Sequence, residues 1–143
     1  MSVLRPREAR RRARTDTMSH ASDVSEGERK WAIAAHLSIF AGFFVPLGNV
    51  LGPFIVLLLS KEEGRFAEFN ARESLNFQIS MTVYILVAGF LTFTSFFLVP
   101  PIGILLILLP PLLVLVNLVL VVKAAIRASD RRRYEYPFSI GFI

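Results

Sequence analysis

The stretch FFVPLGNVLGPF, Phe43 to Phe54, decides how this chain folds, because it interrupts a long run without charged residues, Trp31 to Ser60. Glycine and asparagine accept positive φ, and proline lacks an N–H group that would otherwise need a partner. Either the run crosses a membrane once as a kinked helix, or it is a hairpin whose arms return to the same side. The residues that favour a turn are Pro46, Gly48, Asn49, Gly52 and Pro53.

The composition indicates an integral membrane protein. Of 143 residues, 54% are hydrophobic and 13 are Phe, more than a soluble core of this size can bury. The net charge of +5 comes from basic residues that flank apolar blocks, as expected for side chains that meet anionic lipid at the cytoplasmic face. We therefore expect a lipid bilayer as the partner, and no nucleic acid. The chain has no Cys, hence no disulfide or thiolate ligand.

A second charge-free block runs from Ser74 to Val122 and is roughly twice the ~20 residues that one crossing needs. Its middle, FFLVPPIG from Phe96 to Gly103, carries residues that break a helix. The block is therefore predicted to be a pair of membrane spans, with Pro110 and Pro111 starting or kinking the last helix.

The basic residues predict the topology. All 16 Lys and Arg lie before Trp31, between Lys61 and Glu73, or from Lys123 onward. A single crossing at Trp31 to Ser60 would put some of these segments outside, against the preference of basic residues for the cytoplasm. A hairpin turning at Pro46 to Pro53 puts all of them inside. The prediction is an all-α multipass fold of four helical segments, the first two a short hairpin, with both termini in the cytoplasm.

The arms of this hairpin are short. Trp31 to Val45 and Val50 to Ser60 reach about 22 Å and 16 Å at ~1.5 Å per residue, against a hydrocarbon core of ~30 Å. A half-spanning hairpin, which needs protein or water around its turn, and a single tilted helix with a proline kink both stay open as alternatives.

Three regions follow from these patterns. Residues 1–30 are Arg-rich without an apolar run and are predicted to be a disordered basic arm, with Met18 as an alternative start that would make 1–17 an extension. Residues 31–128 are the transmembrane helical domain. Residues 129–143 are predicted to be an extended tail at the membrane interface, because aromatic and apolar residues alternate in YEYPFSIGFI.

The run RESLNFQISMTVY, Arg72 to Tyr84, places polar residues on two faces of a helix. Both faces cannot meet lipid, so hydrogen bonds to other helices are expected, with a wet lining as the alternative. Asn117 is a candidate partner for either face. His36 is interpreted as a hydrogen-bonded packing residue rather than a proton relay. One face holds Glu73, Asn76, Ser80 and Tyr84, and the other Ser74, Gln78 and Thr82.

Several pieces carry a resemblance to a known family: AAHLSIF, FFVPLGNVLGP, KEEGRFAEFNARESLNFQIS and YEYPFSIGFI. They resemble small bacterial and archaeal membrane proteins of unknown function that are grouped with the twenty-kilodalton Tic subunit of chloroplast inner-envelope protein import. The resemblance implies a four-helix membrane protein related to an import-channel component. Besides the turn residues, its motifs contain Asn76, Phe77, Gln78, Tyr136 and Pro137.

The sequence predicts no catalytic, cofactor-binding or metal site, and we expect the chain not to be an enzyme. The predicted function is a scaffold or partner-binding subunit of the inner (plasma) membrane, with a membrane protein or another copy as partner. The predicted contact face is the loop Lys61 to Arg72 with the tail Arg131 to Phe142. The alternative is an oligomeric passive pore or a transport component for a small solute or polypeptide.

Overall fold

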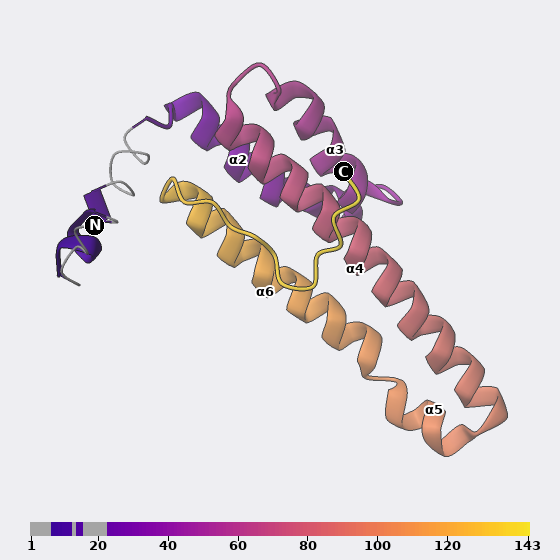
Figure 1. Cartoon of the computed structure of the whole chain (residues 1–143). Coiled ribbons are helices and arrows are strands. Elements are labelled where there is room, and N and C mark those ends of the chain that lie inside the picture. Colours follow the sequence, from indigo (N-terminus) through magenta and orange to yellow (C-terminus); the bar gives the residue numbers. More distant parts are fainter. Residues whose placement is uncertain (1–6, 13, 16–22) are drawn as a thin grey trace.

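The computed structural model describes residues 7–12, 14–15 and 23–143, and the predicted all-helical fold is confirmed there, since every regular element is a helix (Figure 1). Residues 23–143 form five α-helices and one short 3₁₀ helix. In order they are α2 (Glu26–Leu37), the 3₁₀ helix η1 (Ser38–Phe43), α3 (Gly48–Ser60), α4 (Arg65–Leu98), α5 (Pro100–Leu106) and α6 (Leu109–Ser129).

Helix α2 begins at Glu26 because Ser25 and Glu28 form a capping box. The Glu28 backbone N–H donates to Ser25 Oγ, and the Ser25 N–H donates to the Glu28 carboxylate, both at 3.1 Å. The helix thus starts inside the segment predicted to be a disordered arm. Residues 7–12 and 14–15 of that segment are helical too, and only residues 1–6, 13 and 16–22 lie outside the described residues.

The run Trp31 to Ser60 turns back on itself as a hairpin, with α2 and η1 as one arm and α3 as the other (Figure 1). Two glycines of α3 bring the arms together. A Cβ on Gly48 would lie 2.3 Å from the Ala41 carbonyl oxygen, and one on Gly52 would lie 2.2 Å from that of Ser38. Only glycine fits at both positions, as in other small-residue contacts between helices.

The turn is shorter than predicted. It covers Phe44 to Leu47, with Leu47 in the left-handed region at φ 60°, and α3 already starts at Gly48. The prediction that the turn extends to Pro53 is wrong, because the glycines of this stretch serve close helix packing rather than positive φ, and Pro53 lies inside α3.

Helix α4 is the longest element, with 34 residues and a length of about 50 Å. It starts at Arg65, after Gly64 at φ 144°, so only Lys61 to Gly64 connects it to α3. The predicted loop up to Glu73 is therefore wrong. Its charges suggested a solvated loop, but Arg72 and Glu68 pair at 2.7 Å one helical turn apart, while the opposite face buries apolar side chains.

The far end of the bundle holds α5 and α6. A single residue, Val99, separates α4 from α5, and a Cβ on Gly103 would lie 2.3 Å from Phe96 Cα, so α5 folds tightly back on α4. Pro110 lies in the first turn of α6, which confirms that the proline pair starts the last helix. The predicted count of four helical segments is wrong, because a break at Ile107 and Leu108 makes α5 a separate helix.

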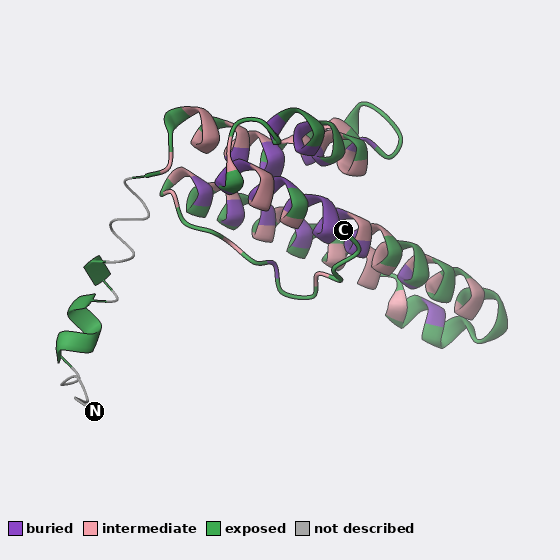
Figure 2. Cartoon of the chain, turned by 45° about the horizontal axis from the view of Figure 1, so that its top comes forward, coloured by how far each residue is buried: buried purple, intermediate pink, exposed green. Residues whose placement is uncertain are grey.

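Two helical stretches are long and apolar enough to cross a membrane, Arg65–Leu98 and Pro100–Ser129, and each is only 11% buried over its most apolar window. Large apolar side chains such as Leu105, 78% exposed, cover their outer half. Figure 2 shows buried residues gathered where the hairpin packs, and exposed ones toward α5. The hairpin lies beside only the first half of α4 (Figure 1).

The last part of the chain has no regular secondary structure and crosses the bundle beside α4 and α6 (Figure 1). We call residues 134–143 the strap. It turns at Pro137 and Phe138, the latter with φ 64°, and Tyr136 is its one buried residue. The alternating aromatics do not share one face: Tyr136 points into the core, whereas Phe138 and Phe142 are exposed.

The close approach at Gly52 predicts that Gly52→Ala destabilises the protein. The new methyl group would collide with the Ser38 backbone, and such overpacking costs about 1–3 kcal/mol of unfolding free energy. Gly89→Ala is the matched control, because nothing lies within 4 Å of a Cβ there. Thermal unfolding in detergent checks both variants, and equal melting temperatures would contradict the close hairpin.

Candidate functional site

Most buried polar side chains of the described residues gather on and around the first half of α4. They occupy two stripes. The first, here the inner stripe, faces α2, α3 and α6; the second, here the strap stripe, faces residues 136–143. The inner stripe consists of Asn70, Ser74, Gln78 and Thr82, and the strap stripe of Glu73, Asn76, Ser80 and Tyr84.

A reciprocal amide pair joins α4 to α6. Gln78 Nε2 donates to Asn117 Oδ1 at 2.9 Å, and Asn117 Nδ2 donates back to Gln78 Oε1 at 3.3 Å. From α3, Asn49 Nδ2 donates to Thr82 Oγ1 at 2.9 Å and to Gln78 Oε1 at 3.5 Å. Three helices thus share one polar cluster, and Asn117 bonds Gln78 as expected from the sequence.

A second network crosses from α4 through α2 to the strap. Asn70 Nδ2 donates to the Phe66 carbonyl at 2.8 Å, which leaves its Oδ1 facing His36 Nε2 at 3.1 Å. His36 Nε2 is therefore the protonated nitrogen, and Nδ1 accepts from the Tyr136 hydroxyl at 2.9 Å. Both ring nitrogens of this fully buried histidine are paired. One turn along, Ser74 donates to the Ala35 carbonyl at 2.8 Å.

Side chains of the strap stripe bind the main chain of residues 136–143. Asn76 Oδ1 accepts from the N–H groups of Phe142 and Ile143, each at 3.1 Å, and its Nδ2 donates to the Ile143 carbonyl at 3.2 Å. Ser80 Oγ accepts from the Ile140 N–H at 2.8 Å.

The ends of the strap stripe make similar contacts. The Tyr84 hydroxyl donates to the Phe138 carbonyl at 2.9 Å, and the Glu73 carboxylate accepts from the Tyr136 N–H at 3.3 Å. Six main-chain groups of a segment without secondary structure are thus hydrogen-bonded to one helix face, which lowers the cost of placing this segment in a low-dielectric surrounding.

Tyr136 anchors the strap. Its ring stacks on Phe77 with centroids 4.0 Å apart and 11° between the planes, inside a cluster that includes Met81 and Val121. Burial raises the pKa of the Tyr136 hydroxyl well above its ordinary value, so the group stays protonated and keeps donating to His36.

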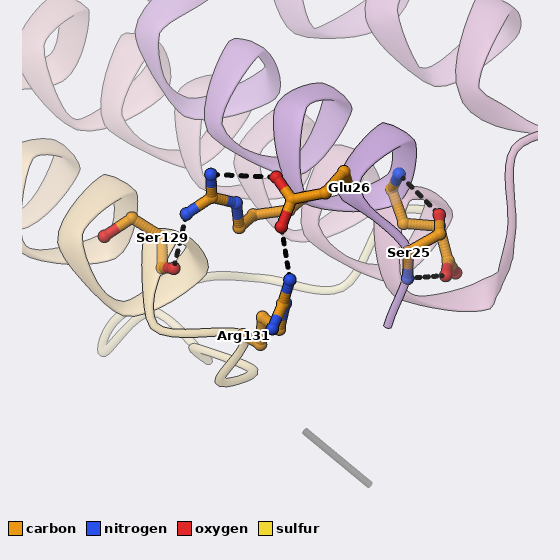
Figure 3. Close-up of polar contacts among 6 residues, drawn as sticks. Ser25, Glu26, Ser129 and Arg131 are labelled. Atoms are coloured by element: carbon orange, nitrogen blue, oxygen red, sulfur yellow. Dashed lines mark hydrogen bonds and ion pairs between the residues drawn. The ribbon is translucent and has the colours of Figure 1, made fainter. Parts of the chain in front are cut away.

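Charged residues tie the start of the strap to α2. Glu26 lies between two guanidinium groups, pairing with Arg29 at 2.9 Å and with Arg131, while Arg29 reaches the Ser129 carbonyl at 3.5 Å (Figure 3). The Glu26 and Arg131 side chains are 56% and 35% exposed, so water screens their attraction and the pair contributes little to stability.

The structure brings most of the sequence-predicted residues together. The two stripes and their partners contain His36, Asn49, Glu73, Asn76, Phe77, Gln78, Asn117 and Tyr136. The others shape the chain away from these networks: Pro46, Gly48, Gly52 and Pro53 in the hairpin and Pro137 at the bend of the strap.

Sequence reasoning missed Asn70. It continues the inner stripe one turn toward the start of α4, at the same four-residue spacing as Ser74 and Gln78. The signal was present, but the segment up to Glu73 was interpreted as a loop, where helical spacing has no meaning. In the part of the chain that the structure describes, no three His, Asp or Glu side chains form a group suited to a metal ion.

The amide pair predicts a double-mutant result. Gln78→Leu should lower the unfolding free energy in detergent by about 0.6–2 kcal/mol, because Asn117 is left without its partner in an apolar surrounding. Adding Asn117→Leu should restore part of the loss, since no orphaned amide is left. Strictly additive single effects in thermal unfolding would contradict the pairing.

Comparison with known proteins gives one family. The model of the magnetosome magnetite crystal formation protein family (MamF/MmsF) matches residues 27–143, which include all the helices described above except the first residue of α2. This match overturns the resemblance to the Tic-grouped proteins, which rested on short pieces of sequence. No curated protein and no solved structure matches the chain. The chain belongs to the magnetosome magnetite crystal formation protein family.

Proposed function

We propose that this chain is a multipass membrane scaffold that works by binding a membrane protein or further copies of itself, without catalysis. The family's description adds the process it would serve, the formation of magnetite crystals in magnetosomes. The membrane is then that of a magnetosome or the plasma membrane, with the charged end of the bundle toward the cytoplasm in either case.

One observation carries the proposal: the polar side chains of the two stripes of α4 already have hydrogen-bond partners within the chain. Gln78, Asn117 and Asn49 form one closed cluster, and the strap stripe is filled by main-chain groups. A water path needs polar groups that face an open space, whereas these already have partners within the chain. This favours a scaffold over the alternative, an oligomeric passive pore or a transport component for a small solute or polypeptide.

The position of the charges supports a topology with both termini in the cytoplasm. The start of α2, the turn from α3 to α4 and the end of α6 lie at the same end of the bundle (Figure 1), and all basic residues of these helices lie there. The tip of the hairpin packs near Thr82, about two and a half turns beyond Glu73, after which the charge-free part of α4 begins. We propose that the hairpin enters the bilayer to about half its depth.

Single cysteines in this Cys-free chain test the topology. A Cys at exposed Glu63 should resist an impermeant maleimide added to intact cells, because that turn faces the cytoplasm. A Cys at Val99, in the break between α4 and α5, should react, since that end faces outward. Labelling of the Glu63 position and protection of the Val99 position would reverse the orientation.

The surface offered to a partner is narrower than the sequence predicted. Phe66 is buried, and Phe69 is covered by the Arg133 guanidinium, 4.9 Å from its ring centroid. Of the predicted loop, the charged turn Lys61 to Glu63 with Arg65 and Arg72 stays exposed. This surface carries charges of both signs, so it can pair with a protein surface of complementary charge. Such pairing gives a complex specificity and a higher association rate.

Photocrosslinking tests the partner. A photoreactive residue in place of Glu62 should yield adducts with a protein in living cells, ideally in a magnetite-forming host. The matched control is the same residue in place of Leu105, 78% exposed on the apolar face of α5, where lipid adducts are expected.

Absence of a protein adduct at Glu62 would sink the scaffold proposal. A second experiment uses purified protein reconstituted in liposomes. Release of a trapped small solute would favour the pore instead.

A further inference from the structure

The strap stripe of α4 is a helix face that binds the strap, a segment without regular secondary structure. Six of its hydrogen bonds reach main-chain atoms of residues 136–143, and the side chains that make them are Glu73, Asn76, Ser80 and Tyr84. A helix face that binds main chain in this way accepts any extended segment with a suitable anchor. In this chain the anchor is Tyr136, which fills the space against Phe77.

The strap is held at few places. Tyr136 is its one buried residue, while Phe138, Ile140, Phe142 and Ile143 are each about half exposed or more. These apolar side chains face outward, where lipid can contact them, and the main-chain groups that face α4 are hydrogen-bonded to it. The attachment thus rests on one aromatic anchor and a row of hydrogen bonds, the kind of contact that opens before the rest of a fold.

The hinge between α6 and the strap favours release. Residues 130–133 reverse the chain with Arg131, a non-glycine residue, in the left-handed region at φ 56°, and its ion pair with Glu26 is partly exposed. An extended hinge would let Arg131 leave that region. Four extended residues span about 13 Å, more than the 8–10 Å between the axes of packed helices.

From these features we infer that two copies exchange straps: residues 134–143 of one copy dock on the strap stripe of a neighbour, and the reverse. Every contact of the strap is kept in such an exchange, so the cost is low, and the membrane already holds both copies in one orientation. The inference rests on the proposed function, because it names the second copy as a partner and the strap stripe as its site.

Mixed single-cysteine chains test the exchange. The Ile140 main-chain N lies 2.8 Å from Ser80 Oγ, so cysteines at the two positions come within the span of a short thiol-to-thiol crosslinker. One tagged chain carries Ser80→Cys and a differently tagged chain carries Ile140→Cys, and both are expressed together and crosslinked in native membranes. A crosslinked heterodimer is expected. A control pair measures crosslinks from random collisions between chains. In it, the Ile140→Cys chain is expressed with a chain that carries Val119→Cys on the exposed, lipid-facing side of α6.

Tyr136→Ala separates exchange from mere proximity. Placed on the Ile140→Cys chain it removes the anchor of the strap that is captured, and the heterodimer should fall about fivefold or more. Placed on the Ser80→Cys chain it should lower the yield clearly less, because the crosslink then reports a captured strap that keeps its own anchor. An equal loss from either chain would overturn the inference.

A chain with both cysteines completes the design. An intrachain crosslink there, with no heterodimer above the collision control in the mixed sample, would show a strap that stays with its own chain and would overturn the exchange. Protein adducts at Glu62 in that same case would leave the scaffold proposal standing, so the two failures are distinguishable.

Discussion

Helix α4 carries amides and hydroxyls on two faces, and hydrocarbon can satisfy neither face. This constraint explains the positions of the hairpin, α6 and the strap. The hairpin and α6 bring Asn49, Asn117 and backbone carbonyls to one face, and the strap brings its own main chain to the other. The apolar residues then pack around these bonds, as Phe77 and Tyr136 do. In a membrane, where burial between helices yields little, such pairings specify which helix lies beside which.

The half-length hairpin divides the bundle into two parts. In the charged half, α2, α3, α4, α6 and the strap surround the polar networks, whereas α4, α5 and the start of α6 continue alone beyond it. The glycine contacts at Gly48 and Gly52 let the two arms of the hairpin approach closely, so the hairpin packs on α4 without widening this half. The half beyond the hairpin has the properties of a membrane anchor, whereas the charged half contains the hydrogen-bonded networks.

Some of this was predictable from sequence because it depends on local pattern. Charge-free blocks and turn residues gave the helices, the reversal near Pro46 and the break near Val99, and helical spacing gave both polar stripes of α4. The start of α4 was missed because charged residues such as Arg65 and Glu68 occur equally in loops and on exposed helix faces. The docking of the strap on α4 was missed for another reason: its bonds join main chain to side chains about 60 residues away, and a main-chain partner leaves no trace in residue type.

The family was beyond such reasoning as well. Short pieces such as LNFQIS suggested another group of membrane proteins, whereas the match that decides the family covers residues 27–143 as a whole. Apolar helical pieces have few residue types to choose from, so short similarities arise easily between unrelated membrane proteins. A pattern distributed over a whole chain is more informative.

The position of the strap along the chain sets an order of events during biosynthesis. Residues 134–143 leave the ribosome after every helix, yet they satisfy a face of α4 that is made some 60 residues earlier. Until they arrive, Asn76 and Ser80 must find temporary partners, in water, in the insertion machinery or in another nascent chain. The protein therefore enters the membrane with an unfinished side, and the final closure of its fold is a late event that other molecules can influence.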